Sequence, residues 1–292
     1  MATTPLAPHH DRIVVGPRRT TFAASRMALG ALLLRDVTVL RKGVVIFVLR
    51  TIVQPFLLCF VFLFVFPKIG QSVGGGGTHG STTFATVLVA GVVGISIMFQ
   101  GVQAVALQMS TEFGYTREIE DRIQAPCPIW LVAFEKVLSG AIQGLISAAI
   151  VLPIASVVHA SGVEASINLH WLILVTLVPL ACIAMGALGL VLGTSFEPQN
   201  IGMMFGFVIL PITFLGGTYY EWTRLAPVKI GAWHWLQTIV LINPLIYVNE
   251  GMRAAFTNSP HMHLYIVYPV LIGFCVAFLT LGLHNFRRRV LS

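Results

Sequence analysis

The sequence predicts an all-α membrane protein with six transmembrane helices, and three observations support that fold class. The 292 residues are 56% hydrophobic, with a mean hydropathy of +0.85, which is more apolar surface than a water-soluble domain hides. Six segments approach the roughly 20 apolar residues that a helix needs to cross a bilayer. They lack the period-two alternation of a membrane β-barrel. The predicted spans are 44–66, 83–108, 130–154, 169–193, 200–217 and 264–285.

Two segments precede the first span. Residues 1–21 are expected to form a disordered cytoplasmic tail. In residues 22–43, a leucine-rich stretch surrounds the charged pair Arg35-Asp36, and this mixture predicts an amphipathic interfacial helix at the membrane surface. The following residues, 44–288, are predicted to form one six-helix transmembrane domain.

The distribution of positive charge predicts the orientation. If both termini are cytoplasmic, thirteen of the 18 lysines and arginines fall on or near the cytoplasmic side, in agreement with the positive-inside rule. The net charge of +7 reflects this bias, and no basic stripe with interleaved aromatic residues predicts a nucleic-acid partner. We therefore expect a multi-pass protein of the cell (inner) membrane.

The sequence carries no pattern for chemistry on this chain. A phosphate-binding loop, GxxxxGK[ST], is absent because none of the lysines follows a glycine. The four cysteines have no metal-site or redox spacing, so small apolar packing residues are expected. His261 and His263 have no carboxylate or cysteine beside them. We predict no catalytic residue, no metal and no cofactor on this chain.

Few polar side chains lie within the predicted spans. Arg50 follows Lys42 by about 12 Å of helix, so it either reaches the headgroups or pairs with a neighbouring helix or a substrate. Four glutamines are costly in lipid, so they either form hydrogen bonds between helices or line a substrate path. The predicted substrate-path residues are Arg50, Gln54, Gln100, Gln103 and Gln143.

The connection 218–262, before the last span, is too apolar for a solvated loop. Its stretch 235–248 is too short to cross a membrane, which predicts re-entrant or interfacial half-helices. Asn243-Pro244 is expected to break the first half-helix. Glu250 and Arg253, at i and i+3 of the second, are expected to return the chain to the polar side.

Charge concentrates between the second and third spans. Five of the six residues in Arg117–Arg122 are charged, although only 10% of the chain is. Ile119 and Ile123, at i and i+4, would give a short helix an apolar face, and Pro126 and Pro128 would end it. Both a solvated loop and a docking surface for a soluble protein fit this pattern.

These features together resemble the type 2 ABC exporter permeases, membrane subunits that work with a separate ATPase. The resemblance covers roughly residues 25–288. One motif follows the second span, and its acidic, glycine, proline and basic positions are Glu112, Gly114, Glu120, Pro126, Pro128 and Lys136. The other, NPL-x-Y-x-x-E-x-x-R, is present as Asn243, Pro244, Leu245, Tyr247, Glu250 and Arg253.

The resemblance implies partners. Two ATPase subunits would bind ATP and Mg²⁺, and a second permease copy, identical or homologous, would complete a dimer in the bilayer. The cytoplasmic loop 109–129 would couple the ATPase to the permease. In one departure, Thr111–Tyr115 is aromatic-rich where the family often carries charge. The implied ATPase-coupling residues are Glu112, Gly114, Arg117, Glu118, Glu120, Asp121 and Arg122.

The scarcity of ionisable residues in the spans argues against a small hydrophilic substrate and favours export of an amphiphile, a drug or a lipid. The loop Arg117–Arg122 resembles the daunorubicin-resistance drug-export branch. Arg35-Asp36 and Gln54-Pro55 are also similar to polysaccharide exporters. Export of a polysaccharide or lipid-linked glycan is therefore one alternative. A non-transport scaffold or a lipid-modifying enzyme is the alternative of a different class.

Overall fold

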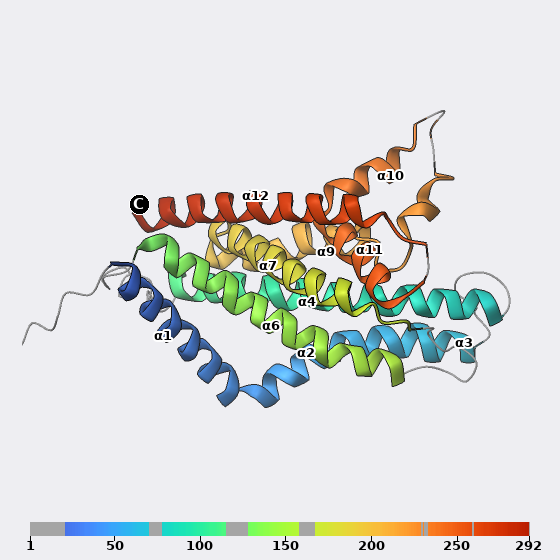
Figure 1. Cartoon of the computed structure of the whole chain (residues 1–292), viewed down its shortest axis with the longest axis horizontal. Helices are drawn as coiled ribbons and strands as arrows, with labels where there is room; N and C mark the ends of the chain where they lie inside the picture. The colour runs from blue at the N-terminus through green and yellow to red at the C-terminus, as the bar shows by residue number, and fades with distance from the viewer. Residues whose placement is uncertain are drawn as a thin grey trace, which may run out of the picture.

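The computed structural model is a bundle of long helices. It describes residues 21–69, 78–114, 128–157, 167–228, 230, 233–258 and 260–291. Six helical segments in these ranges are long and apolar enough to cross a membrane, which confirms the predicted number of spans (Figure 1). They are Val44–Lys68, Phe84–Gly114, Ile129–Ile154, Trp171–Ser195, Pro198–Leu215 and Leu264–Val290.

The second span is the centre of the bundle. Its apolar stretch is 94% buried inside the protein, and the third and fourth spans pack along it. Close approach depends on small residues. A Cβ at Gly186 in the fourth span would stand 2.8 Å from the backbone oxygen of Val137 in the third, so this crossing requires a glycine. The helices concerned are α4 (Thr78–Gly114), α6 (Ile129–Val157), α7 (Trp171–Ser195) and α12 (Leu264–Leu291), which packs along α7.

The first span meets the preceding helix at Gly43, forming an elbow beside the bundle (Figure 1). The interfacial position predicted for that first helix stays a prediction. The predicted tail, 1–21, lies outside the described residues except for Thr21. The elements are α1 (Thr21–Lys42), α2 (Val44–Cys59), the π-helical η1 (Phe60–Val65) and α3 (Phe66–Lys68).

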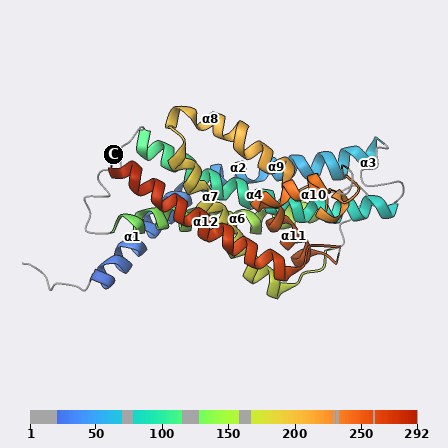
Figure 2. The same cartoon turned by 90° about the horizontal axis from the view of Figure 1, so that it is seen from above.

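The fifth span is irregular and lies along one long edge of the bundle (Figure 2). Only 17% of it is buried, so most of its apolar surface faces away from the protein. A π-helical segment interrupts the α-helix shortly before Pro211. The pieces are η2 (Pro198–Asn200), α8 (Ile201–Met204), η3 (Phe205–Ile209) and α9 (Leu210–Leu215).

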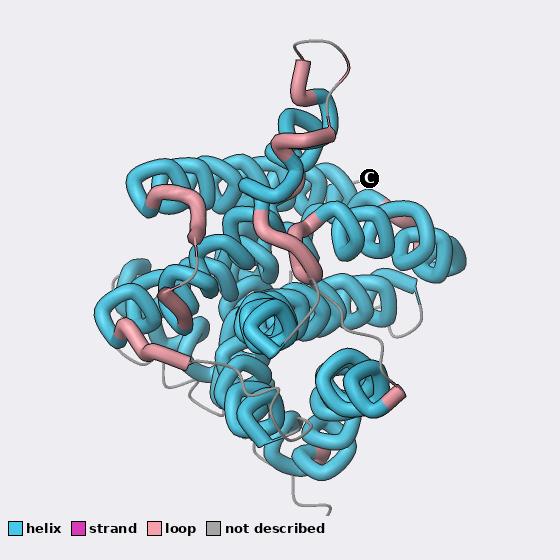
Figure 3. The backbone as a smooth tube through the Cα atoms, turned by 90° about the vertical axis from the view of Figure 1, so that its right-hand side faces the viewer, coloured by secondary structure: helices cyan, strands magenta, loops and turns pink. Residues whose placement is uncertain are grey.

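The connection before the last span contains two half-helices in opposite environments. The helix break expected at Asn243-Pro244 is present, since the first half ends at Ile242 and the second begins at Pro244. Ile242 is 76% exposed, whereas every residue of the second half is buried, in contact with α4, α7 and α12. The first half projects from the bundle (Figure 3). The elements are η4 (Trp222–Leu225), α10 (Trp235–Ile239), η5 (Val240–Ile242) and α11 (Pro244–Phe256).

Candidate functional site

A cavity of about 540 Å³ lies where α1, α2, α4 and α6 meet, and we call it the elbow cavity. Its walls are mixed, with carboxylates, arginines and amides beside aliphatic and aromatic side chains. Ligand sites of roughly 300–1,000 Å³ commonly combine apolar walls with a few polar groups. The lining residues used below are Arg35, Asp36, Val39, Ile46, Arg50, Gln103, Ala104, Glu112, Ser139 and Gln143.

The structure brings the five predicted substrate-path residues together. Arg50, Gln103 and Gln143 line the elbow cavity. Gln54 and Gln100 line an adjoining cavity of about 120 Å³, which Arg50 and Gln103 also border. The two cavities form a polar strip along α2 and α4. Whether substrate follows this strip stays a prediction.

Arg50 and Gln100 connect the first span to the second. Arg50 Nη2 donates a hydrogen bond of 3.2 Å to Gln100 Oε1, and Gln100 Nε2 donates to the hydroxyl of Thr51. Gln100 is buried, whereas Arg50 is exposed. Hydrogen bonding between helices, one of the two interpretations of the amides, is therefore observed at Gln100. Arg50 pairs with a neighbouring helix and still presents its guanidinium to the cavity.

An ionic cluster lies at the end of the elbow cavity nearest the second-to-third span connection. Lys136 Nζ lies 2.8 Å from Glu112 Oε1, 3.8 Å from Glu135 Oε2 and 3.9 Å from Asp36 Oδ2. The Lys136 and Glu135 side chains are fully buried. The predicted span 130–154 therefore carries a buried acid and a buried base, Glu135 and Lys136, and the expectation that the spans are almost free of ionisable groups is wrong there. Glu112 lies beyond the predicted span 83–108, near the end of α4.

Three consecutive residues at the end of α4 each contact a different span. Glu112 pairs with Lys136 of α6. The ring of Phe113 lies 4.6 Å from the guanidinium carbon of Arg289 on α12, a cation–π contact. A Cβ on Gly114 would stand 2.5 Å from the ring of Pro198, so its backbone closely approaches the start of the fifth span.

These contacts bear on the implied ATPase-coupling residues. Glu112 is only 4% exposed and is held by Lys136, so its carboxylate fixes the end of α4 to α6 inside this chain. Gly114 ends α4. The other implied coupling residues, Arg117, Glu118, Glu120, Asp121 and Arg122, lie outside the described residues.

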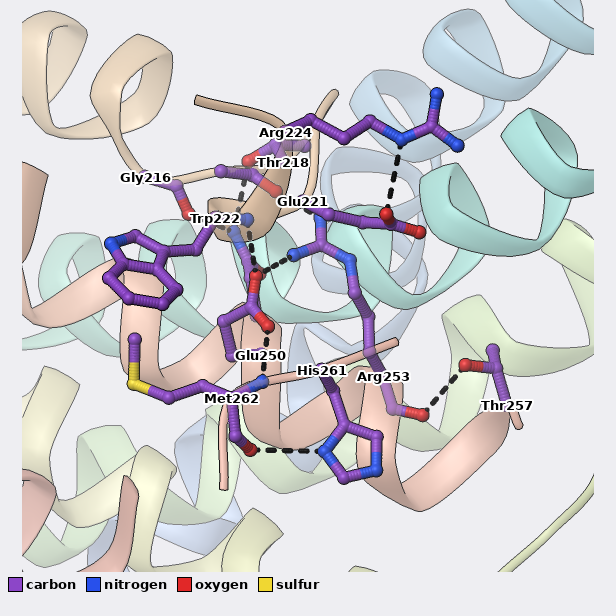
Figure 4. A network of polar contacts seen from close by, with 12 residues as sticks. Gly216, Thr218, Glu221, Trp222, Arg224, Glu250, Arg253, Thr257, His261 and Met262 are labelled. Carbon is purple, nitrogen blue, oxygen red and sulfur yellow. Dashed lines mark hydrogen bonds and ion pairs between the residues drawn. The ribbon is translucent and has the colours of Figure 1, made fainter. Parts of the chain in front are cut away.

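Glu250 and Arg253 of α11 tie separate segments together (Figure 4). Glu250 Oε1 accepts hydrogen bonds from the Trp222 N–H at 2.8 Å and Arg253 Nη1 at 2.7 Å, while its Oε2 accepts from the Met262 N–H at 2.8 Å. Arg253 Nη2 donates to the carbonyl oxygen of Gly217, whose φ of +69° favours glycine. Burial lowers the pKa of Arg253, and the Glu250 carboxylate opposes that shift. Both side chains are fully buried inside the protein, and the return of the chain to the polar side of the membrane at this point stays a prediction.

The remaining motif residues on this connection also have structural contacts. Asn243 caps α11, since its Oδ1 accepts from the Leu245 N–H at 2.9 Å, and its Nδ2 donates to the Ile212 oxygen of α9 at 2.7 Å. The Tyr247 hydroxyl donates to the Leu241 oxygen at 3.0 Å. The NPL-x-Y-x-x-E-x-x-R pattern therefore holds the connection on the bundle.

The described histidines and cysteines lie apart from one another or in contact with other groups of the protein. No group of three or more His, Cys, Asp and Glu side chains in the described part of the chain is placed to hold a metal ion. His263 stacks on Tyr265 with ring centroids 5.2 Å apart, and His261 Nδ1 lies 3.0 Å from the Met262 oxygen. Three cysteines, at Cys59, Cys182 and Cys275, are buried.

Asp36 and Glu135 were missed as contributors to the site by sequence reasoning. Glu135 stands next to Lys136 in an apolar segment, and an adjacent acid and base within a predicted span is a recognisable signal of a buried pair. Asp36 lies 100 residues before Lys136, and only the fold shows that α1 carries it to the cluster.

Comparison with known proteins gives two findings. The family model described as "ABC-2 type transporter" matches residues 27–257. The chain is 27% identical over 233 residues to the inner membrane transport permease YadH of Escherichia coli strain K12, covering 78% of this chain and 84% of the relative. Proteins of the same name from Escherichia coli O157:H7 and Shigella flexneri match with the same identity and coverage.

Proposed function

Because the chain belongs to the ABC-2 type transporter family, we propose that it is the membrane subunit of an ATP-driven exporter. It moves an amphiphilic substrate, a drug or a lipid-like molecule, out of the cytoplasm or the inner leaflet. It lies in the inner membrane with both termini in the cytoplasm. Two separate ATPase subunits bind ATP and Mg²⁺, and a second permease copy completes the transporter.

The elbow cavity is the observation that supports an amphiphilic substrate best. Arg50, Gln103 and Gln143 provide polar groups, while Val39 and Ile46 provide an apolar wall at the surface of the bundle. Its volume of about 540 Å³ suits a drug-sized molecule or a lipid headgroup. An extended glycan is larger, so this cavity favours the amphiphile over the polysaccharide alternative.

The end of α4 supports the coupling role of the loop that follows it. Glu112, Phe113 and Gly114 each contact a different span, so a displacement of this end reaches α6, α12 and the fifth span together. Gln103 lies on the same helix, about 14 Å before Glu112 at 1.5 Å per residue. A push on the loop therefore moves the cavity wall as part of one rigid helix.

Charge reversal in the loop tests this function. The chain is co-expressed with its ATPase, and the double variant Glu118→Arg, Asp121→Arg is compared with Lys68→Glu, a charge reversal at the end of α3. We expect the loop variant to lose ATPase co-purification and ATP-dependent movement of daunorubicin or a fluorescent phospholipid in proteoliposomes. We expect Lys68→Glu to retain both, because its side chain is exposed at the end of the first span that lies away from the elbow.

Three outcomes would reject parts of the proposal. Wild-type recovery and transport in the loop variant would remove the docking role. Recovery of the chain without any ATPase partner would favour a scaffold. Substrate turnover by the purified chain alone would favour a lipid-modifying enzyme.

A further inference from the structure

We propose that the elbow cavity binds the phosphate of a membrane amphiphile, with Arg50 as the anion-binding residue, while the acyl chains stay in the surrounding lipid. This inference rests on the proposed function, because it names the substrate class that the exporter takes. Three observations support it: Arg50 has unused hydrogen-bond donors, the cavity is open at the surface of the bundle, and neutral polar side chains line the cavity.

Arg50 has hydrogen-bonding capacity to spare. A guanidinium carries five N–H donors, and the one partner shown for Arg50 is the neutral amide of Gln100. Arg50 forms no ion pair with any residue of the described ranges. An arginine within a membrane span is costly unless it is paired. A phosphate bound by paired N–H···O bonds would offset that cost.

The cavity opens beside an exposed apolar helix surface. Val39 of α1 and Ile46 of α2 both line it, and these side chains are 61% and 76% exposed. They stand on either side of Gly43, so the opening lies between the two arms of the elbow. The neighbouring surface of α2 is apolar, with Val45 and Leu49 also exposed. A molecule can therefore place its headgroup inside while its chains contact lipid and this apolar surface.

Neutral polar side chains line the cavity around Arg50. Gln103 of α4 and Ser139 and Gln143 of α6 border the same space. Amides and hydroxyls hydrogen-bond phosphate oxygens and glycerol hydroxyls without adding charge.

Asp36 and Glu112 also line the cavity, beside Arg35. With Glu135 they make three carboxylates against the two cations Lys136 and Arg35. This part of the cavity therefore disfavours a second negative charge, so a headgroup with one phosphate fits better than a polyanion.

Ligand binding to the purified full-length chain in detergent tests the inference without the ATPase. The probe is dioctanoyl phosphatidylglycerol, and affinity is read from the shift of the thermal unfolding midpoint during titration. Dioctanoylglycerol supplies the chains without phosphate, and inorganic phosphate supplies the anion without chains. The variants are Arg50→Gln, Arg50→Lys, the cavity-filling Ala104→Leu, and Arg288→Gln on an exposed part of α12 as the matched charge control.

We expect phosphatidylglycerol to stabilise the wild-type chain more than either partial probe does. Arg50→Gln should weaken its affinity about tenfold, because the charge-assisted hydrogen bonds from the guanidinium to the phosphate are lost. Arg50→Lys should restore part of the affinity, Ala104→Leu should reduce it, and Arg288→Gln should match the wild type.

Three results would overturn the inference. One is equal affinity of Arg50→Gln and Arg288→Gln for phosphatidylglycerol, and another is equal stabilisation by dioctanoylglycerol. The third is full stabilisation by inorganic phosphate, which would indicate a site for a soluble anion. Binding without ATP-dependent export would count against the exporter role alone, whereas export without this binding would count against the phosphate site alone.

Discussion

At the scale of single residues, Lys136 determines whether three carboxylates are tolerated inside the bundle. Its ammonium group lies within 4 Å of Glu112, Glu135 and Asp36, and its side chain is fully buried. Removing one partner of a buried ion pair is costly because the other charge stays in a low-dielectric interior. Lys136 is therefore expected to matter more for stability than any exposed lysine.

The substitution Lys136→Met is expected to destabilise the protein by about 3–5 kcal/mol. The measurement is denaturant or thermal unfolding in detergent, with the exposed Lys42→Met as the matched control. The double variant Lys136→Met, Glu112→Met removes the uncompensated charge of Glu112 as well. It should recover part of the loss, and equal stability of the single variant and the control would contradict the assignment.

At the scale of elements, the α6–α7 crossing depends on the absence of a side chain at Gly186. Its virtual Cβ would lie 2.8 Å from the Val137 oxygen, which belongs to backbone and cannot rotate away. Gly273 of α12 has nothing within 4 Å of the same position. The two glycines therefore form a natural comparison between a packed and an open helix surface.

We expect Gly186→Ala to destabilise the protein by about 1–3 kcal/mol, the usual cost of overpacking a filled interior. Gly273→Ala should be neutral or slightly stabilising, because alanine has the higher helix propensity. Unfolding curves of the two variants in the same detergent provide the measurement. Equal unfolding midpoints for the two variants would contradict the prediction, because α6 and α7 would then accommodate the added methyl group without loss of stability.

At the scale of the whole molecule, the distribution of positive charge predicts the orientation in the membrane. A fluorescent protein that matures only in the cytoplasm, fused after Ser292, should fluoresce because Arg287–Arg289 stand at that end of α12. Alkaline phosphatase inserted after Lys229, in the connection before the last span, should be active because that enzyme requires the oxidising side. The opposite pattern of the two reporters would invert the topology and would place the elbow cavity in the outer leaflet.

The number of spans was predictable because span length and hydropathy are local properties of the sequence. The break at Asn243-Pro244 was predictable for the same reason, since capping and the missing proline N–H act within a few residues. The Lys136 cluster joins residues 24 and 100 positions apart, which no local pattern records. Glu250 and Arg253 were recognised as a local pair, but their burial depends on Trp222 and Met262, which other segments supply.

The elbow at Gly43 has a mechanical consequence. The Gly43 N–H donates to the Val39 oxygen at 3.1 Å, and the Gly43 oxygen accepts from the Phe47 N–H at 3.0 Å. Gly43 itself has non-helical dihedral angles, with φ of −101° and ψ of 19°, so α1 ends before it and α2 begins after it. The corner is therefore a hinge between two helices. A load applied to α1 changes the angle between α1 and α2, and with it the aperture between Val39 and Ile46, while the Arg50–Gln100 hydrogen bond keeps α2 on α4.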